Sequence, residues 1–331
     1  MKNIAMANRH YDHIIYHKQC FDGFTSLFVA YVAGVIDKDT SIYPDVPSAT
    51  STPPGVMGKD VLIVDVAYNI DILREIIDTA KSVTFIDHHI SIRDDVQNFI
   101  EKDMAEYRKT KYVKIIYSED MCGATLIWRF LYGENAVPLF IKYIEDNDTG
   151  TWKYDKTKPF ILALQSNYTM TPSFSNLEQW KTLLNKYHVF KMCADGMIMQ
   201  KYHDTILTDN ARRYSLELFP SETVYNKFKD HFEKKGQYRV AVFCGMGCPS
   251  VTSMGTKLLD VVDCDFVMIW TLNIDRKEYV IAMRSKEVDI SKIAKLFGGG
   301  GHKLAGAFSF TVDEYNILDL FYDQSLPRQS K

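Results

Sequence analysis

The stretch VLIVDVAYNIDILREIIDTAKSVTFIDHH, residues 61–89, predicts the fold of the N-terminal part of the chain. Residues 61–66 form an almost continuous apolar run, which is typical of a strand buried on both faces of a sheet. Apolar residues then recur at helical spacing over 69–80, with Asn69 as a suitable N-cap, and a second strand pattern follows at 83–87. This order makes a βαβ unit, which implies a parallel sheet.

The rest of the sequence extends the α/β pattern over a length that suits about two domains. Further strands are predicted at 12–17 and 111–117, whereas residues 156–235 show helical periodicity and no strand pattern. A β-rich pattern returns after this segment. We therefore expect an α/β fold in three parts: a parallel-sheet domain over 1–185, a helical connector over 186–236 and a smaller α/β domain over 237–331.

Charge and cysteine content limit the functional classes. The chain has 39 basic and 42 acidic residues and a net charge of −3, which argues against coating long nucleic acid but allows a short anionic ligand. Its six cysteines include no C-x-x-C pair, as expected for a reduced intracellular protein. The sequence shows no secretory apolar segment and no run of 18 apolar residues. We expect a cytoplasmic protein without a membrane partner, and a homodimer is compatible with the sequence.

Candidate metal ligands follow three predicted strands and one predicted helix. Taken singly, such residues are usually helix N-caps or surface histidines. The carboxyl ends of parallel strands meet at one edge, however, and carboxylates gathered there would repel one another without cations. Mixed carboxylate and imidazole ligands suit Mn²⁺, Mg²⁺ or Fe²⁺, and we expect two ions. The candidates are His17 and Asp22, then Asp65, then Asp87, His88 and His89, and finally Asp146 and Asp148.

A glycine-rich stretch, LFGGGGHKLAGAFSF over residues 296–310, marks a second candidate site. Consecutive glycines let backbone N–H groups converge on an anion, although a flexible turn is the ordinary interpretation of four glycines. Arg284 and Ser285 end a predicted strand upstream, where they would suit a phosphate clamp.

Five segments in order resemble the motifs of the DHH phosphoesterase family, which includes RecJ-like nucleases, nanoRNases, cyclic-dinucleotide phosphodiesterases and pyrophosphatases. The segments are YHKQCFDGFTS, VLIVD, FIDHHIS, EDNDTGTW and MRS…FGGGGHKLAGAFSF. The resemblance covers most of the chain. It implies a metal-dependent phosphohydrolase in which a metal-activated water cleaves phosphodiester bonds of short nucleic acids or dinucleotides, in a cleft between the two domains. The implied partner is a short oligonucleotide, a dinucleotide or another small phosphorylated substrate.

The same resemblance implies roles for the matched residues. His17, Asp22 and His88 would bind metal, usually Mn²⁺, and Asp65 would bridge two ions. Asp87 and His89 would support catalysis, and either Asp146 or Asp148 would be a further ligand. The residues implied to grip the substrate's phosphate or terminal nucleotide are Arg284, Gly299, Gly300, Gly301 and His302.

Cys20 departs from the family pattern, because it stands where the first Asp of a D-x-D motif is common. Cys20 could coordinate a metal as a thiolate, or a water could take the ligand position instead. One metal site could also be weak, or the side chain could have a packing role only. This substitution keeps open a catalytically degraded scaffold that binds nucleotides or a partner protein. Among enzymes, the alternative is a phosphoanhydride hydrolase of the pyrophosphatase or exopolyphosphatase type that uses the same metals.

Overall fold

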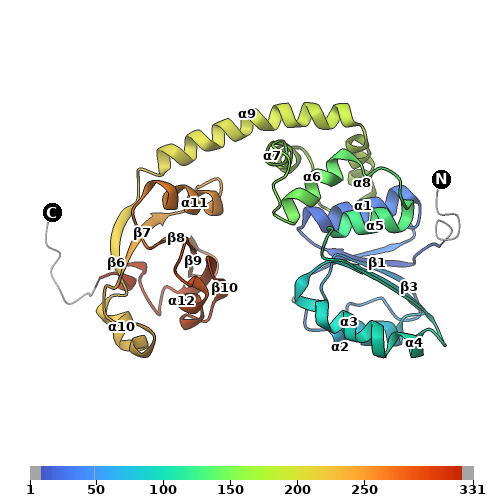
Figure 1. The fold of residues 1–331 in the computed structure, drawn as a ribbon, viewed down its shortest axis with the longest axis horizontal. Coiled ribbons are helices and arrows are strands. Elements are labelled where there is room, and N and C mark those ends of the chain that lie inside the picture. The colour runs from blue at the N-terminus through green and yellow to red at the C-terminus, as the bar shows by residue number, and fades with distance from the viewer. Residues whose placement is uncertain (1–8, 48, 323–331) are drawn as a thin grey trace. The chain divides into compact units, whose positions relative to one another are not determined.

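The computed structural model describes residues 9–47 and 49–322, and the chain divides into two compact units, Met1–Gln200 and Lys201–Lys331 (Figure 1). The long helix α9 (Lys186–Asn210) runs across this division. Each unit is built on its own sheet, so the predicted α/β class with an N-terminal parallel sheet is confirmed. The domain limits set from the sequence at residues 185 and 236 stay a prediction.

The first unit contains, in its described part, a five-stranded parallel sheet in the order β2-β1-β3-β4-β5. Asp60 to Val64 of β3 pair in register with Ser82 to Ile86 of β4, and α2 connects the two strands. This is the predicted βαβ unit, and Asn69 caps α2 by accepting a hydrogen bond from the Ile72 N–H. The strands are β1 (His13–His17), β2 (Ser41–Asp45), β3 (Asp60–Val64), β4 (Ser82–Asp87) and β5 (Tyr112–Tyr117).

Helices cover both faces of this sheet (Figure 1). On one face α1 and α5 pack against alternate strand residues such as Ile14 and Leu62, and on the other α2 and α3 pack against Ile15 and Val61. Both faces of the central strands are therefore buried, which explains their apolar runs. The helices are α1 (Phe21–Ala33), α2 (Ile70–Thr79), α3 (Arg93–Lys102), α4 (Met104–Tyr107), α5 (Gly123–Tyr132), α6 (Leu139–Asp148), α7 (Thr157–Asn167) and α8 (Phe174–Trp180).

The second unit contains, in its described part, a six-stranded mixed sheet in the order β10-β11-β9-β8-β7-β6. One face packs against α11 and the other against α10 and α12. The strands are β6 (Ser215–Phe219), β7 (Tyr238–Cys244), β8 (Phe266–Asn273), β9 (Glu278–Ser285), β10 (Gly300–His302) and β11 (Ala305–Thr311). The helices are α10 (Glu222–Phe228), α11 (Val251–Val261) and α12 (Ile290–Leu296).

Two elements contradict the sequence-based expectations. Residues 156–235 were expected to lack strands, but β6 lies within them and pairs with β7. β6 is short and sits at a sheet edge, so it carries no long apolar run that would reveal it. β2 was also missed, because Pro44 in its SIYPD sequence is unusual for a strand.

None of the helices in the described residues combines the length and the apolar character needed to cross a lipid bilayer.

Candidate metal centre

The carboxyl ends of three adjacent strands bring the predicted ligands to one edge of the first sheet. β1 ends at His17, β3 is followed at once by Asp65, and β4 ends at Asp87 before His88 and His89. Because β1, β3 and β4 are parallel neighbours, these residues from three segments of the chain lie close together.

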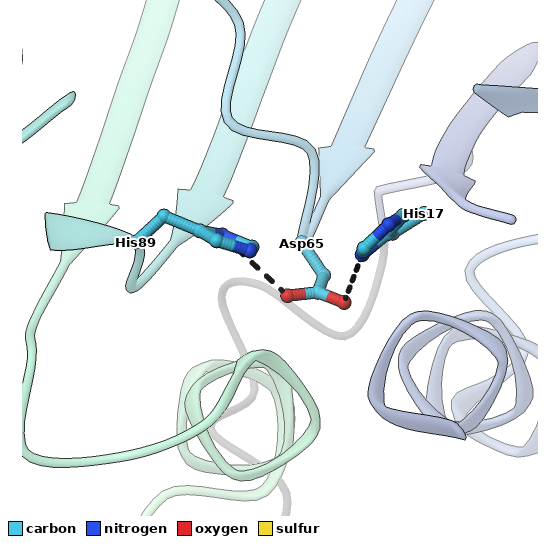
Figure 2. Close-up of side chains that lie close together, drawn as sticks. All are labelled: His17, Asp65 and His89. Carbon is cyan, nitrogen blue, oxygen red and sulfur yellow. Dashed lines mark ion pairs between the residues drawn. The ribbon is translucent and has the colours of Figure 1, made fainter. Parts of the chain in front are cut away.

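His17, Asp65 and His89 form a first cluster of metal-ligating atoms (Figure 2). Asp65 lies between the two imidazoles, with its Oδ2 3.5 Å from His17 Nδ1 and its Oδ1 3.9 Å from His89 Nδ1. Each residue offers one atom within 4.8 Å of the others. Two nitrogens and one oxygen at this spacing can hold a divalent cation.

Asp22, His88 and Asp148 form a second cluster. His88 Nε2 lies 3.6 Å from Asp22 Oδ2 and 3.4 Å from Asp148 Oδ2. It also lies 3.2 Å from Asp65 Oδ1, so Asp65 contacts histidines of both clusters. Asp65 is thus placed where a carboxylate could bridge two ions.

The N-terminus of α5 binds the Asp22 carboxylate through two backbone N–H groups. These residues were not identified from the sequence. The N–H groups of Gly123 and Ala124 donate to the two carboxylate oxygens of Asp22, at 2.6 and 2.8 Å. A Cβ on Gly123 would lie 2.9 Å from Asp65 Cβ and 3.0 Å from Asp22 Oδ2. A glycine is therefore needed where α5 approaches both carboxylates. No signal in the sequence marks this contact.

Asp65 itself has a backbone φ of 61°, in the left-handed region that residues other than glycine rarely adopt. Such conformations persist where the surrounding structure enforces them, and they are common at functional sites. This conformation directs the chain out of β3 and leaves the Asp65 side chain between His17 and His89 (Figure 2).

Asp87 is fully buried and organises the turn that carries the two histidines. Its Oδ1 accepts hydrogen bonds from the N–H groups of His88 and His89, at 2.7 and 2.8 Å, and lies 2.9 Å from His89 Nδ1. Tyr117 on β5 donates to the His89 carbonyl at 3.1 Å. Asp87 therefore fixes the turn that carries His88 and His89, and its role in catalysis stays a prediction.

Asp146 and Asp148, which the sequence left as alternatives, occupy different environments. Asp148 belongs to the second cluster. Asp146 is outside both clusters, and its carboxylate accepts hydrogen bonds from the loop that follows α6. Its donors are Thr151 Oγ1, the N–H groups of Lys153 and Tyr154, and Thr157 Oγ1.

Cys20 is the N-cap residue of α1 and is outside both clusters as well. Burial raises the pKa of its thiol far above the usual range, and the carboxylates of Asp65 and Asp22 raise it further. In the absence of a cation this environment favours the protonated thiol over the thiolate.

The clustered carboxylates of the centre favour the binding of positive charge. Burial and the neighbouring carboxylates of Asp65 and Asp148 raise the pKa of Asp22 well above its usual value. For His88, burial opposes the charged form, but hydrogen bonding to Asp65 and the charge of Asp22 raise its pKa to about 9. For Asp65, burial likewise opposes ionisation, and the histidines lower its pKa to about 2. In the metal-free centre, protons on Asp22 and His88 offset the carboxylate charge that bound cations could offset instead.

Unpaired polar atoms support the same interpretation. His17 Nδ1 and Asp65 Oδ2 are both buried, lie 3.5 Å apart and have no hydrogen-bond partner among the described residues. Buried polar atoms normally find partners, and a metal ion would satisfy both. The residues of the two clusters therefore fit divalent cations.

The residues predicted to hold substrate lie in the second unit. His302, Ala305 and Arg284 stand side by side across β10, β11 and β9. The Arg284 guanidinium donates to Thr252 Oγ1 on α11, at 3.0 Å, whereas Ser285 Oγ accepts from two backbone N–H groups of the following turn. Ser285 is therefore engaged in shaping that turn.

Two of the four glycines before His302, Gly299 and Gly301, are tightly packed, in contrast to the flexible turn that four glycines ordinarily suggest. A Cβ on either of the other two would meet no atom within 4 Å. A Cβ on Gly299 would lie 2.2 Å from the Ala307 carbonyl oxygen, and one on Gly301 would lie 2.4 Å from that of Ala305. Gly300 and Gly301 belong to β10, which pairs with β11. Their role in substrate binding stays a prediction.

The fold and the two clusters define an α/β protein with a candidate two-metal centre, and no protein-family model matches the chain. An uncharacterised protein of Acanthamoeba polyphaga mimivirus, R106, is 25% identical over 346 residues, covering 97% of this chain and 75% of that protein. Oligoribonuclease NrnB of Bacillus subtilis is 22% identical over 261 residues, covering 74% of this chain and 57% of that protein.

Similar solved structures include the pGpG-specific phosphodiesterase PggH of Vibrio cholerae. It is 11% identical, with a TM-score of 0.47, and the match covers 91% of this chain and 94% of that one. An exopolyphosphatase-related protein of Bacteroides fragilis is 13% identical, with a TM-score of 0.43, and the match covers 91% and 87%. Neither likeness is close enough to carry a functional conclusion.

Proposed function

We propose that the chain is a metal-dependent phosphodiesterase that hydrolyses short oligoribonucleotides or dinucleotides. The observation that carries this proposal is the position of Asp65, whose carboxylate contacts His17 and His89 of one cluster and His88 of the other. Two cations on either side of such a carboxylate are suited to displacement at phosphorus.

The ligands of the proposed ions would come from the two clusters. His17, Asp65 and His89 would hold one ion, and Asp22, His88 and Asp148 the other. Bound ions would lower the pKa of a water and offset the charge of the reacting phosphate. The ligand set of carboxylates and imidazoles favours Mn²⁺, with Mg²⁺ and Fe²⁺ as alternatives.

Other groups of the first unit would act by positioning. Asp87 fixes the turn at His88 and His89, and the N-terminus of α5 fixes Asp22. His89 has a raised pKa: burial opposes its charged form, but hydrogen bonding to Asp87 favours it. With an ion bound by the first cluster, His89 would be a neutral ligand whose ring Asp87 orients.

Two further observations support a short substrate. The similarity to oligoribonuclease NrnB extends over 74% of this chain and suggests RNA fragments as the substrate class. The nearly balanced charge of −3 disfavours long nucleic acid, which binds mainly through phosphate contacts to many Lys and Arg side chains. Arg284 and His302, which pair with Ala305 from the strands on either side of β11, would hold the distal phosphate or terminal nucleotide.

The experiment is a hydrolysis screen of the full chain with Mn²⁺, Mg²⁺ or a chelator. Its substrates are a diadenylate, short oligoribonucleotides, cyclic dinucleotides, 3′-phosphoadenosine phosphate and pyrophosphate. We expect metal-dependent cleavage of the diadenylate or short RNA, and loss of at least about 100-fold in His88→Ala and Asp65→Asn because each removes a ligand. His10→Ala, which alters an exposed histidine outside both clusters, is the control.

Hydrolysis of pyrophosphate without cleavage of any diester would instead indicate a phosphoanhydride hydrolase. A wild-type chain that binds no divalent metal and cleaves no substrate would indicate a degraded scaffold. Either result would overturn the proposed phosphodiesterase activity.

A further inference from the structure

The loop between α6 and α7 presents an exposed tryptophan close to a candidate metal ligand. Trp152 is 49% exposed, whereas Trp180 is fully buried and Trp128 is 8% exposed. It follows Asp148 of the second cluster by four residues, which span at most about 14 Å even when fully extended. The exposed Trp152 ring is therefore accessible to a ligand close to the candidate metal centre.

The backbone at this tryptophan is strained, and the strain is enforced by a buried residue. Trp152 has a φ of 51°, in the left-handed region. Its two neighbours in sequence, Thr151 and Lys153, both donate to Asp146 Oδ1, at 2.7 and 2.6 Å. Asp146 is buried, so its carboxylate clamps the loop on both sides of the exposed ring. Residues held in sparsely populated conformations in this way concentrate at ligand-binding sites.

A basic side chain lies close to the exposed ring. Lys158 Nζ lies 4.9 Å from the centre of the Trp152 ring. Two further lysines of this region also lie over aromatic rings, Lys153 over Tyr154 at 5.7 Å and Lys156 over Phe190 at 5.2 Å. Aromatic rings interleaved with cations are what single-stranded nucleic acids require, because bases stack on the rings and phosphates pair with the cations.

We propose that Trp152 is a base-stacking residue, on which a nucleobase of the substrate packs while the adjoining phosphate lies at the two clusters. Lys158 would then pair with a neighbouring phosphate of the substrate. Asp146 would be a positioning residue that acts only by fixing the loop between α6 and α7. The inference rests on the proposed function for the identity of the substrate. It assigns to the first unit a contact with the base, in addition to the contacts with the phosphate.

The experiment measures binding separately from turnover. Adenosine monophosphate, which is not a diester, is titrated into the full chain with Mg²⁺ while tryptophan fluorescence is recorded, and ribose 5-phosphate is the matched ligand without a base. We expect quenching by adenosine monophosphate and none by ribose 5-phosphate. Trp152→Phe should abolish the quenching but keep the affinity measured by calorimetry within about threefold, because a phenyl ring still stacks.

Trp152→Ala should weaken the binding of adenosine monophosphate by about 10-fold or more and raise the KM for a diadenylate more than it lowers kcat. Tyr187→Ala, which removes another exposed aromatic ring from α9, is the control and should change neither. Equal affinity of the wild type and Trp152→Ala, or equal affinity for the two ligands, would overturn the inference. Base-dependent quenching in a chain that cleaves no diester would keep the stacking site and remove only the proposed activity.

Discussion

Asp146 and Asp148 lie two residues apart on α6, yet only Asp148 reaches His88, at 3.4 Å, while Asp146 binds the loop that follows. The two carboxylates therefore differ in what they contribute. Asp146 is satisfied by hydrogen bonds, and although burial opposes its charge, those hydrogen bonds lower its pKa. Burial and the charge of Asp65 instead raise the pKa of Asp148.

This contrast predicts effects of different size on stability when each carboxylate is removed. Asp146→Ala should lower the free energy of unfolding by about 3 kcal/mol, because several buried donors lose their charged acceptor. Asp148→Ala should change the free energy of unfolding by less than about 1 kcal/mol in the presence of a chelator, since this substitution removes a carboxylate that its neighbours repel. Urea denaturation of the metal-free proteins provides the measurement. Equal losses in both variants would contradict the assignment of Asp146 to the loop and Asp148 to the metal.

Gly123→Ala should damage the metal centre more than the fold. The added Cβ would push α5 away from Asp65 and Asp22, so we expect metal affinity to fall by about 10-fold or more. Gly133→Ala is the control: it adds a Cβ that meets no atom within 4 Å but occupies a φ of 61°, so it should cost about 1 kcal/mol of stability and leave metal affinity intact. Calorimetric metal titration distinguishes the two. Unchanged affinity in Gly123→Ala would show that this close approach is not required.

Cys20→Asp tests the departure from the D-x-D pattern. A carboxylate at this N-cap would add an oxygen ligand beside Asp65 and Asp22, so metal affinity should rise by about 10-fold. Cys20→Ser should leave it unchanged, because the protonated thiol supplies no charge to the centre. Titration of Mn²⁺ into each variant gives the answer. Reduced affinity in Cys20→Ser would instead identify the sulfur as a ligand.

His13 predicts a pH dependence of stability away from the metal centre. It lies buried at the start of β1, both of its ring nitrogens lack hydrogen-bond partners among the described residues, and its pKa is lowered by burial and by Lys59. Below about pH 6.5 the unfolded chain binds a proton that the folded chain excludes, so stability falls as the pH decreases, by up to about 1.4 kcal/mol per pH unit from this group. Above pH 6.5 this loss disappears.

Urea denaturation of the wild type and His13→Leu between pH 5 and pH 8 checks this expectation. The leucine variant should lose less stability between pH 6.5 and pH 5 than the wild type does. Parallel curves over this interval would mean that His13 takes up its proton equally in both states.

Much of the architecture was predictable because it is determined by local periodicity. The apolar runs of β3 and β4 and the Asn69 cap of α2 predicted a parallel βαβ unit, and parallel strands place Asp65 and His88 at one edge. β2 and β6 were missed because short edge strands bury little surface, so tertiary pairing rather than composition decides their conformation.

The finer features of the centre depend on contacts between distant residues. The Asp22 carboxylate meets the Gly123 N–H across 101 positions of sequence, which no local pattern encodes. The sequence likewise could not distinguish Asp146 from Asp148, because the choice depends on how the loop after α6 folds back. It also offered many aromatic residues as stacking partners, and only exposure and backbone conformation single out Trp152.

The most direct test of the two-metal account is the number of divalent ions bound per chain, measured by elemental analysis after equilibrium dialysis against Mn²⁺. We predict two ions for the wild type and one each for His17→Ala and Asp148→Ala, because each of these variants removes a ligand from one cluster only. Asp65→Asn should bind fewer ions than either, since Asp65 contacts both clusters. Two ions retained in Asp65→Asn, or none in the wild type, would contradict the account.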